Sequence, residues 1–206
     1  MSTWPALPDS QNADPTPWTQ DVEMAYALAA RAVILPPFQR AWAWSPERVC
    51  EYLQGLFDGV PQTPLALWRP SHHGPHIVLD GQHRLAALGA DVPGRTCPAV
   101  HFDLLTLRWE PGEADGVMTL APSTVIGRTM LDLWGPLATA EERAYATHVA
   151  LIKQRHRSAR VPIIERRGEA TPSAWRDAYA YFERLNRSVP FTAAELDAFA
   201  AFVETA

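Results

Sequence analysis

The chain has 206 residues, of which 47% are hydrophobic and 20% are charged, and its formal net charge at pH 7 is -5. These values are those of a globular protein with one core, and they exclude a disordered chain and a globally basic nucleic-acid binder. Two cysteines, Cys50 and Cys97, are too few for a disulfide framework and indicate free, buried thiols in a reducing compartment. Neither a membrane-spanning apolar run nor a secretory leader is evident, so we expect a cytoplasmic protein without membrane contact.

The N-terminal part of the sequence predicts a loosely held arm followed by a single domain. Residues 1–18 are rich in proline and polar groups, which is typical of a flexible arm, and residues 19–206 are expected to form the domain. The Ala-rich stretch 19–32 predicts a helix. Residues 33–35 predict a short strand, which ends at two consecutive prolines that force an extended turn.

The clearest helix signal in the chain starts at Ser45-Pro46. Serine is a good N-cap, and proline is favoured at the first helical position. Apolar residues then recur at helical spacing until Gly59 and Pro61 end the helix. These apolar residues are Val49, Tyr52, Leu53, Leu56, Phe57 and Val60.

Strands and helices alternate through the rest of the chain. Strands are expected over 64–68, 76–79, 98–107 and 161–164. Helices are expected over 84–90 and 141–156. Two more helices are expected, one around the apolar stripe Trp175, Tyr179, Phe182 and Leu185, and one that starts at the capping box Thr192–Glu195. Residues 110–136 are expected to be irregular. The predicted class is α+β (mixed α/β), with a small mixed sheet in the first half and helices dominating the second half.

The stretch DGQHR, Asp80 to Arg84, lies at the corner between a predicted strand and a predicted helix. Helix N-termini bind anions, glycine permits close backbone approach, and Arg84 and His83 are donors suited to phosphate oxygens. Asp80 would repel phosphate unless a divalent metal, usually Mg²⁺, bridges them. The corner therefore indicates metal-nucleotide or phosphodiester chemistry. On composition alone a purely structural role is the more frequent case: Asp80 caps the helix and pairs with Arg84, and His83 is solvated.

Three segments of the chain, in order, resemble a known family. They are LPPFQRAWAWSPERVCEYLQGLFDG, VLDGQHRLAAL and YFERLNRSVPFTAAEL, with VPIIE before the last, and together they span about residues 30 to 203. They resemble the DGQQR-motif nucleotide-hydrolysing domain of GmrSD-type restriction enzymes, which belongs to the ParB/sulfiredoxin superfamily. The resemblance implies a ParB/sulfiredoxin-like fold, a nucleoside triphosphate (ATP, GTP or CTP) as substrate or ligand, and a Mg²⁺ cofactor.

The resemblance also implies roles for individual residues. Asp80, Gly81, Gln82, His83 and Arg84 would form the phosphate corner, with Asp80, His83 and Arg84 catalytic and Asp80 the metal ligand. Gln39 and Arg40 would close over the nucleotide, and Asn186 would approach the same pocket. Their alternatives are a surface turn for Gln39 and Arg40, and a helix C-cap for Asn186.

The sequence departs from the family at informative places. His83 replaces the family's second glutamine, and superfamily members with a His-Arg pair here include sulfiredoxin and free serine kinases. Gln82 stands where sulfiredoxin has its catalytic cysteine, which argues against sulfinic acid reduction. The larger relatives carry a C-terminal nuclease domain, and we expect none in this chain. A nuclease activity would then come from a partner subunit, and a homodimer is the alternative assembly.

The expected activity is hydrolysis of a nucleoside triphosphate or transfer of its terminal phosphoryl group in DNA restriction, modification or phage biology. A kinase would act on free serine or on a hydroxylated base in DNA. The alternative from another class is a nucleotide-gated DNA-binding module, favoured by one local basic run. That run comprises Lys153, Arg155, His156, Arg157, Arg160, Arg166 and Arg167.

Two further groups of side chains, one of tryptophans and one of histidines, are candidates for binding. Trp42 and Trp44 flank the Gln39-Arg40 segment and are candidates to stack on a base. His72 and His73 are close to His76, but their spacing fits no standard metal site and favours a solvated turn.

Overall fold

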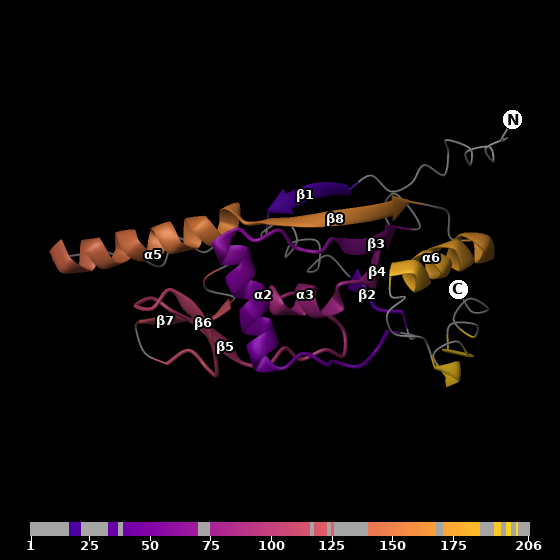
Figure 1. The fold of residues 1–206 in the computed structure, drawn as a ribbon, viewed down its shortest axis with the longest axis horizontal. Coiled ribbons are helices and arrows are strands. Elements are labelled where there is room, and N and C mark those ends of the chain that lie inside the picture. Colours follow the sequence, from indigo (N-terminus) through magenta and orange to yellow (C-terminus); the bar gives the residue numbers. More distant parts are fainter. Residues whose placement is uncertain are drawn as a thin grey trace, which may run out of the picture.

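The computed structural model describes residues 17–21, 33–36, 39–69, 75–115, 118–122, 125, 140–167, 171–185, 192–194, 197, 198 and 201. Within them the chain forms an α+β fold with two sheets, which confirms the predicted class (Figure 1). The strands are β1 (Pro17–Asp21), β2 (Val33–Ile34), β3 (Leu65–Arg69), β4 (His76–Asp80), β5 (Val100–Asp103), β6 (Arg108–Pro111), β7 (Thr119–Leu120) and β8 (Arg160–Arg167). The helices are α2 (Pro46–Asp58), α3 (Gln82–Ala87), α5 (Ala140–Ser158) and α6 (Pro172–Leu185).

The larger sheet has five strands in the order β1-β8-β3-β4-β2 and is mixed. Strand β8 pairs antiparallel with β1 and parallel with β3, while β4 pairs antiparallel with β3 and parallel with β2. The second half of the chain thus supplies a strand of this sheet as well as helices α5 and α6. A smaller antiparallel sheet has the order β6-β5-β7 and contacts α2.

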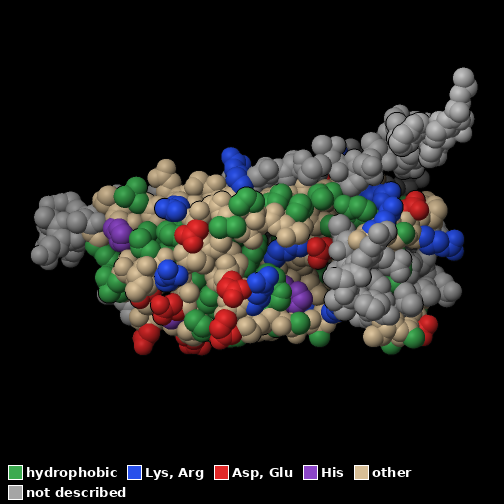
Figure 2. All heavy atoms as spheres, in the orientation of Figure 1, with side chains coloured by type: hydrophobic (Ala, Val, Ile, Leu, Met, Phe, Trp, Pro, Cys, Tyr) green, Lys and Arg blue, Asp and Glu red, His purple; other side chains and the backbone are tan. Residues whose placement is uncertain are grey.

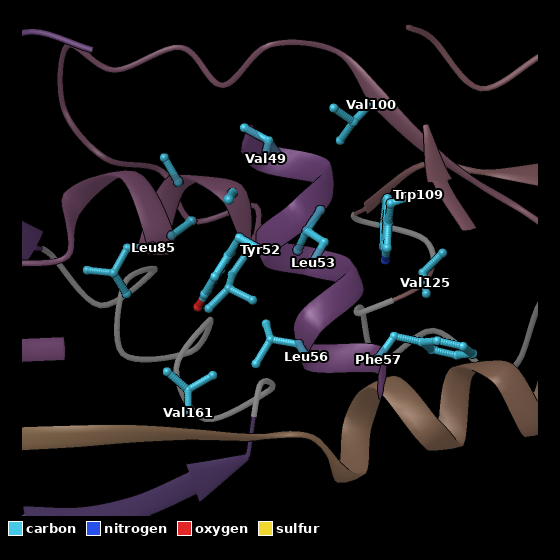
Figure 3. Close-up of a cluster of buried hydrophobic side chains, with 14 of the residues drawn as sticks. Val49, Tyr52, Leu53, Leu56, Phe57, Leu85, Val100, Trp109, Val125 and Val161 are labelled. Carbon is cyan, nitrogen blue, oxygen red and sulfur yellow. The ribbon is translucent and has the colours of Figure 1, made fainter. Parts of the chain in front are cut away.

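Helix α2 forms where its local signals predict it. The Ser45 hydroxyl accepts a hydrogen bond from the Arg48 N–H, Pro46 opens the helix, and Gly59 ends it in the left-handed conformation (φ 77°). The amphipathic pattern buries one face of the helix, including Val49, which is fully inaccessible. Figure 3 shows side chains of this face among residues from α3, the small sheet and β8.

The alternation of side chains along β4 builds two hydrophobic clusters, one on each face of the large sheet. Val78 belongs to the main core with α2, whereas Ile77 and Leu79 face the second cluster with Tyr179 of α6. Period-2 alternation then assigns Asp80, at the end of β4, to the same face as Val78. The strand end that carries Asp80 is therefore held from both sides.

The structure changes the predicted organisation at the N-terminal end. Pro17 and Trp18, assigned to the flexible arm, and Thr19 to Asp21, assigned to a helix, form β1 along β8. The remainder of the predicted helix, residues 22–32, lies outside the described residues. Among the residues that the structure describes, no helix has the length and apolarity needed to cross a membrane.

Candidate functional site

The corner between β4 and α3 is a tight backbone turn that requires glycine. Gly81 has φ 99°, in the left-handed region, and α3 begins at Gln82, two residues before the predicted start. A Cβ on Gly81 would lie 2.4 Å from Leu65 Cδ2 and 3.2 Å from Arg84 Nη2. Since α3 has six residues, the chemistry of this corner rests on side chains more than on a helix dipole.

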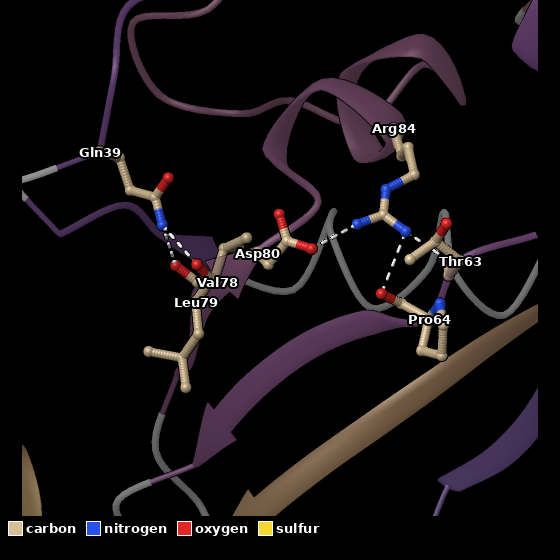
Figure 4. Close-up of polar contacts among 7 residues, drawn as sticks. All are labelled: Gln39, Thr63, Pro64, Val78, Leu79, Asp80 and Arg84. Atoms are coloured by element: carbon tan, nitrogen blue, oxygen red, sulfur yellow. Dashed lines mark hydrogen bonds and ion pairs between the residues drawn. The ribbon is translucent and has the colours of Figure 1, made fainter. Parts of the chain in front are cut away.

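Arg84 is buried, with 8% of its surface exposed, and its guanidinium donates hydrogen bonds to other groups of the protein. Nη2 donates to Asp80 Oδ2 at 2.7 Å, while Nη1 donates to the carbonyls of Thr63 and of Pro64, the latter at 3.0 Å (Figure 4). A guanidinium has five N–H groups, so part of its donor capacity remains. The Asp80–Arg84 pairing that the sequence left open is present. The Asp80 side chain stays 32% exposed and is accessible to a ligand.

The segment before α2 is fastened to this corner by amides and one arginine. Gln39 Nε2 donates to the carbonyls of Val78 and Leu79, at 2.9 and 2.8 Å (Figure 4). Gln82 Nε2 donates to the Arg40 carbonyl at 2.8 Å, and its Oε1 accepts from Arg95 Nε at 2.7 Å. The structure thus brings Gln39, Arg40 and Gln82 together, with their described bonds directed to protein groups.

Arg95 completes this attachment and was not among the predicted site residues. Its Nη2 donates to the carbonyls of Gln39 and Arg40, at 3.1 and 2.6 Å. Arg95 follows a Pro-Gly turn and belongs to no motif. The two carbonyls that it binds are more than 50 residues away in the chain. No local signal could have found it.

His83 packs against both tryptophans of the fastened segment. Its ring stacks on Trp44 at 13° with centroids 5.5 Å apart, and its centroid is 4.8 Å from that of Trp42. Its Nε2 accepts the Ala43 N–H at 3.0 Å. Burial, followed by the charge of Arg95, lowers the pKa of His83 below its ordinary value. The bond from Ala43 makes Nε2 an acceptor, so this nitrogen does not supply the second phosphate donor, and the role of His83 at the corner stays a prediction.

A pocket of about 320 Å³ adjoins the corner and is lined by Arg84 together with aromatic and polar residues of α2 and its flanks. Trp44 and Arg48 contribute an aromatic face and a guanidinium, whose Cζ lies 5.7 Å from the Trp44 ring centroid. Tyr52 is 6% exposed, and its hydroxyl has no hydrogen-bond partner among the described residues. Burial raises the pKa of Tyr52, so the hydroxyl remains a donor. The lining therefore combines two guanidinium groups with a tyrosine whose hydroxyl is buried and unpaired among the described residues.

Other predicted site residues fall in different places. Asn186 and the pair His72-His73 lie outside the described residues, so their roles stay predictions. Asp80 is the metal ligand suggested by sequence, and no group of three His, Cys, Asp or Glu side chains suited to a metal occurs in the described ranges. A cation at Asp80 would depend on oxygens from its substrate, which is how Mg²⁺ is commonly held beside phosphates.

The basic run from Lys153 to Arg167 does not form one patch. Lys153 is buried, with 2% exposure, so its predicted contact with DNA phosphates is wrong. Arg166 lies over Tyr181, whereas Arg167 Nε donates to Glu165 at 2.5 Å. Figure 2 shows basic and acidic side chains interspersed on the viewed face.

The two cysteines are free, and only Cys50 meets the prediction of burial in full, since Cys97 is half-buried. Burial raises the pKa of each thiol to about 11. Both thiols are therefore protonated near neutral pH, which makes them poor nucleophiles.

No protein-family model matches this chain, and a search of curated proteins found no match either.

Proposed function

We propose that the chain is a Mg²⁺-dependent, cytoplasmic nucleotide-binding enzyme with a ParB/sulfiredoxin-like domain, which hydrolyses a nucleoside triphosphate or transfers its terminal phosphoryl group. The observation that carries the proposal is the pocket beside the DGQHR corner. It combines the Trp44 ring, the Arg48 and Arg84 guanidinium groups and the unpartnered Tyr52 hydroxyl. An aromatic face suits a nucleobase, and guanidinium groups suit phosphate oxygens.

The residues of this pocket divide the binding between them. Trp44 stacks on the base, while Arg48 and the remaining N–H groups of Arg84 bind the phosphates. The Tyr52 hydroxyl donates to a polar atom of the ligand, which removes the cost of leaving a buried donor unpaired. Arg84 Nη2 is 2.7 Å from Asp80 Oδ2. The same guanidinium therefore contacts both Asp80 and the proposed phosphate site.

Asp80 holds the metal or orients the attacking group in this proposal. Mg²⁺, when bound, neutralises charge on the transferred phosphoryl group. Attack by water forms a bond from its oxygen to the terminal phosphorus and breaks the bond to the bridging oxygen, which gives free phosphate, the nucleoside diphosphate and a proton. Attack by a hydroxyl of serine or of a modified base gives the phosphorylated acceptor. His83 acts as a positioning residue, because its ring supports Trp44 and its Nε2 holds the Ala43 N–H.

The first experiment follows the terminal phosphate of labelled ATP, GTP and CTP with Mg²⁺, with and without serine, plain DNA and DNA with hydroxylated bases. Asp80→Asn keeps an oxygen for Arg84 but removes the carboxylate charge. We expect turnover to fall roughly 10²-fold, since a metal ligand stabilises the transition state by several kcal/mol. Asp177→Asn, at an exposed position on α6, is the matched control. Full turnover by a folded Asp80→Asn protein would remove Asp80 from the mechanism. Nucleotide binding without turnover in the wild type would favour the regulatory module.

A second experiment tests the pocket directly. Tyr52→Phe removes the unpartnered hydroxyl and little else, so thermal stability should be kept or raised. Nucleotide affinity should nevertheless fall by roughly tenfold, the value of about one hydrogen bond. Arg48→Ala should weaken affinity too, and Arg176→Ala on the exposed side of α6 should not. Unchanged affinity in both pocket variants would place the nucleotide elsewhere.

A further inference from the structure

A second pocket, of about 340 Å³, lies where the end of α2 meets the junction of α5 and β8. It is distinct from the pocket beside the DGQHR corner. Its lining includes Phe57 and Asp58 at the end of α2 and Arg155, Ser158 and Arg160 across the junction. The proposed function uses none of these residues. The turn Val60-Pro61 lines this pocket and also the pocket beside Arg84, so the two cavities flank one turn.

Arg155 is held in place while its terminal nitrogens are left open. The side chain is exposed, its Nε donates to the Phe57 carbonyl at 2.8 Å, and its Cζ lies 4.5 Å from the Phe57 ring centroid. No hydrogen bond from its Nη atoms to another described residue is found. A ligand would therefore meet a guanidinium whose rotamer is already restricted, which lowers the entropy cost of binding.

Arg160 is the second cation of the pocket, and it follows the end of the helix that carries Arg155. The Ser158 hydroxyl donates to the Arg155 carbonyl at 2.9 Å, and the Ala159 N–H donates to the His156 carbonyl at 3.2 Å. These two bonds end α5 just before Arg160 begins β8. The pocket thus carries two exposed arginines, one near the end of α5 and one at the start of β8.

The charges of the lining residues favour an anion. Arg155 and Arg160 are opposed by Asp58, and both carboxylate oxygens of Asp58 accept from Gln54 Nε2 at 3.2 Å. Two guanidinium groups from different parts of the lining match tetrahedral oxygens better than a single planar carboxylate. Phe57 supplies an apolar wall.

We propose that this pocket is a phosphate-binding site, separate from the nucleotide pocket, in which Arg155 and Arg160 bind the oxygens. The phosphate can come from two sources, a free phosphate or the backbone of a nucleic acid. Both arginines belong to the basic run that the sequence singled out, and both line this cavity.

The test uses the full chain and calorimetric titration with three probes: inorganic phosphate, a mixed-sequence single-stranded oligonucleotide and acetate. Phosphate or the oligonucleotide should bind the wild type more tightly than acetate does. Arg155→Lys keeps the charge but loses the fork, and Arg160→Ala removes an exposed side chain. Each should weaken binding at least about tenfold, as expected for a charge-assisted hydrogen bond. Arg176→Ala is the matched control and should bind like the wild type.

The arms of the experiment separate the sources and the sites. Binding of inorganic phosphate alone indicates a free phosphate, whereas oligonucleotide binding that phosphate competes away indicates a nucleic-acid backbone. Arg160→Ala is expected to fold normally, so it keeps the test valid if Arg155→Lys loosens the end of α2. The proposal fails if Arg160→Ala binds like the wild type, if acetate binds as well as phosphate, or if Arg48→Ala and not Arg160→Ala abolishes binding.

Discussion

Gly81 is the residue on which the shape of the corner depends. Its φ of 99° would strain an L-residue by about 1–2 kcal/mol, and a Cβ would collide with Leu65 Cδ2 at 2.4 Å. Leu65 is fully buried in the main core, so relief would require repacking at a cost of about 1–3 kcal/mol. We therefore expect Gly81→Ala to lower the free energy of unfolding in urea by about 2–5 kcal/mol.

Gly94 provides the control for this substitution. Its φ is 67°, and a Cβ there would meet no atom within 4 Å. Gly94→Ala should cost the backbone strain alone, about 1–2 kcal/mol. Equal losses for the two variants would show that packing against Leu65 does not contribute.

At the scale of elements, the attachment of residues 39–44 to the corner determines where Trp44 lies. Arg95 bonds Gln82 and two carbonyls of that segment, and His83 holds the Ala43 N–H. Arg95→Ala removes the three bonds of Arg95 and leaves the His83–Ala43 bond, so the segment should open more often. We expect the Ala43 amide to exchange hydrogen at least about tenfold faster, which corresponds to the loss of one or two hydrogen bonds.

Nucleotide affinity should fall in the same variant, because Trp44 would lose its fixed position. Arg108→Ala, at an exposed position on β6, is the control and should leave the exchange of Ala43 unchanged. If Arg95→Ala exchanged at the wild-type rate, the hydrogen bonds of Arg95 would not be what holds the segment.

The elements that sequence could predict are those whose signals are local. Helix α2 has its cap, its opening proline and its ending glycine within its own sequence, and both of its ends were predicted. Val60, which was counted in its apolar stripe, lies beyond Gly59 and is exposed. Strand β1 was missed because its partner β8 begins about 140 residues later, and nothing in its own residues records that pairing. The strand-to-helix corner was predicted from its local pattern. The hydrogen bonds that Gln82 and His83 make to other parts of the protein could not be predicted, because their partners are distant in the chain.

At the scale of the whole molecule, His156 lies where three parts of the fold meet. The ring is 2% exposed, and its centroid is 4.7 Å from Phe57 of α2, 5.0 Å from Phe102 of β5 and 5.5 Å from Trp109 of β6. Its Nε2 has no hydrogen-bond partner among the described residues. Burial, with a smaller effect of the Arg155 charge, lowers its pKa to about 3. The aromatic box therefore holds a neutral imidazole that links α5 to α2 and the small sheet.

This linkage makes the protein less stable in mild acid. In the unfolded chain the pKa of a histidine is about 6.5, so that state takes up a proton below this pH while the folded state does not. The free energy of unfolding should be constant above pH 6.5 with respect to this group, and should fall as the pH is lowered toward about 3. At pH 5 the loss is about 2 kcal/mol.

His76 and His83 also have lowered pKa values through burial, so they act in the same direction, and a variant is needed to isolate His156. His156→Phe keeps a ring in the box and cannot be protonated. Urea unfolding at pH 7 and at pH 5 should show a pH-dependent loss smaller by about 2 kcal/mol than in the wild type. His101→Phe, at a half-buried position on β5, should retain the wild-type loss. If His156→Phe loses as much stability as the wild type between these two pH values, then protonation of His156 does not limit acid stability, and the box opens before the imidazole is charged.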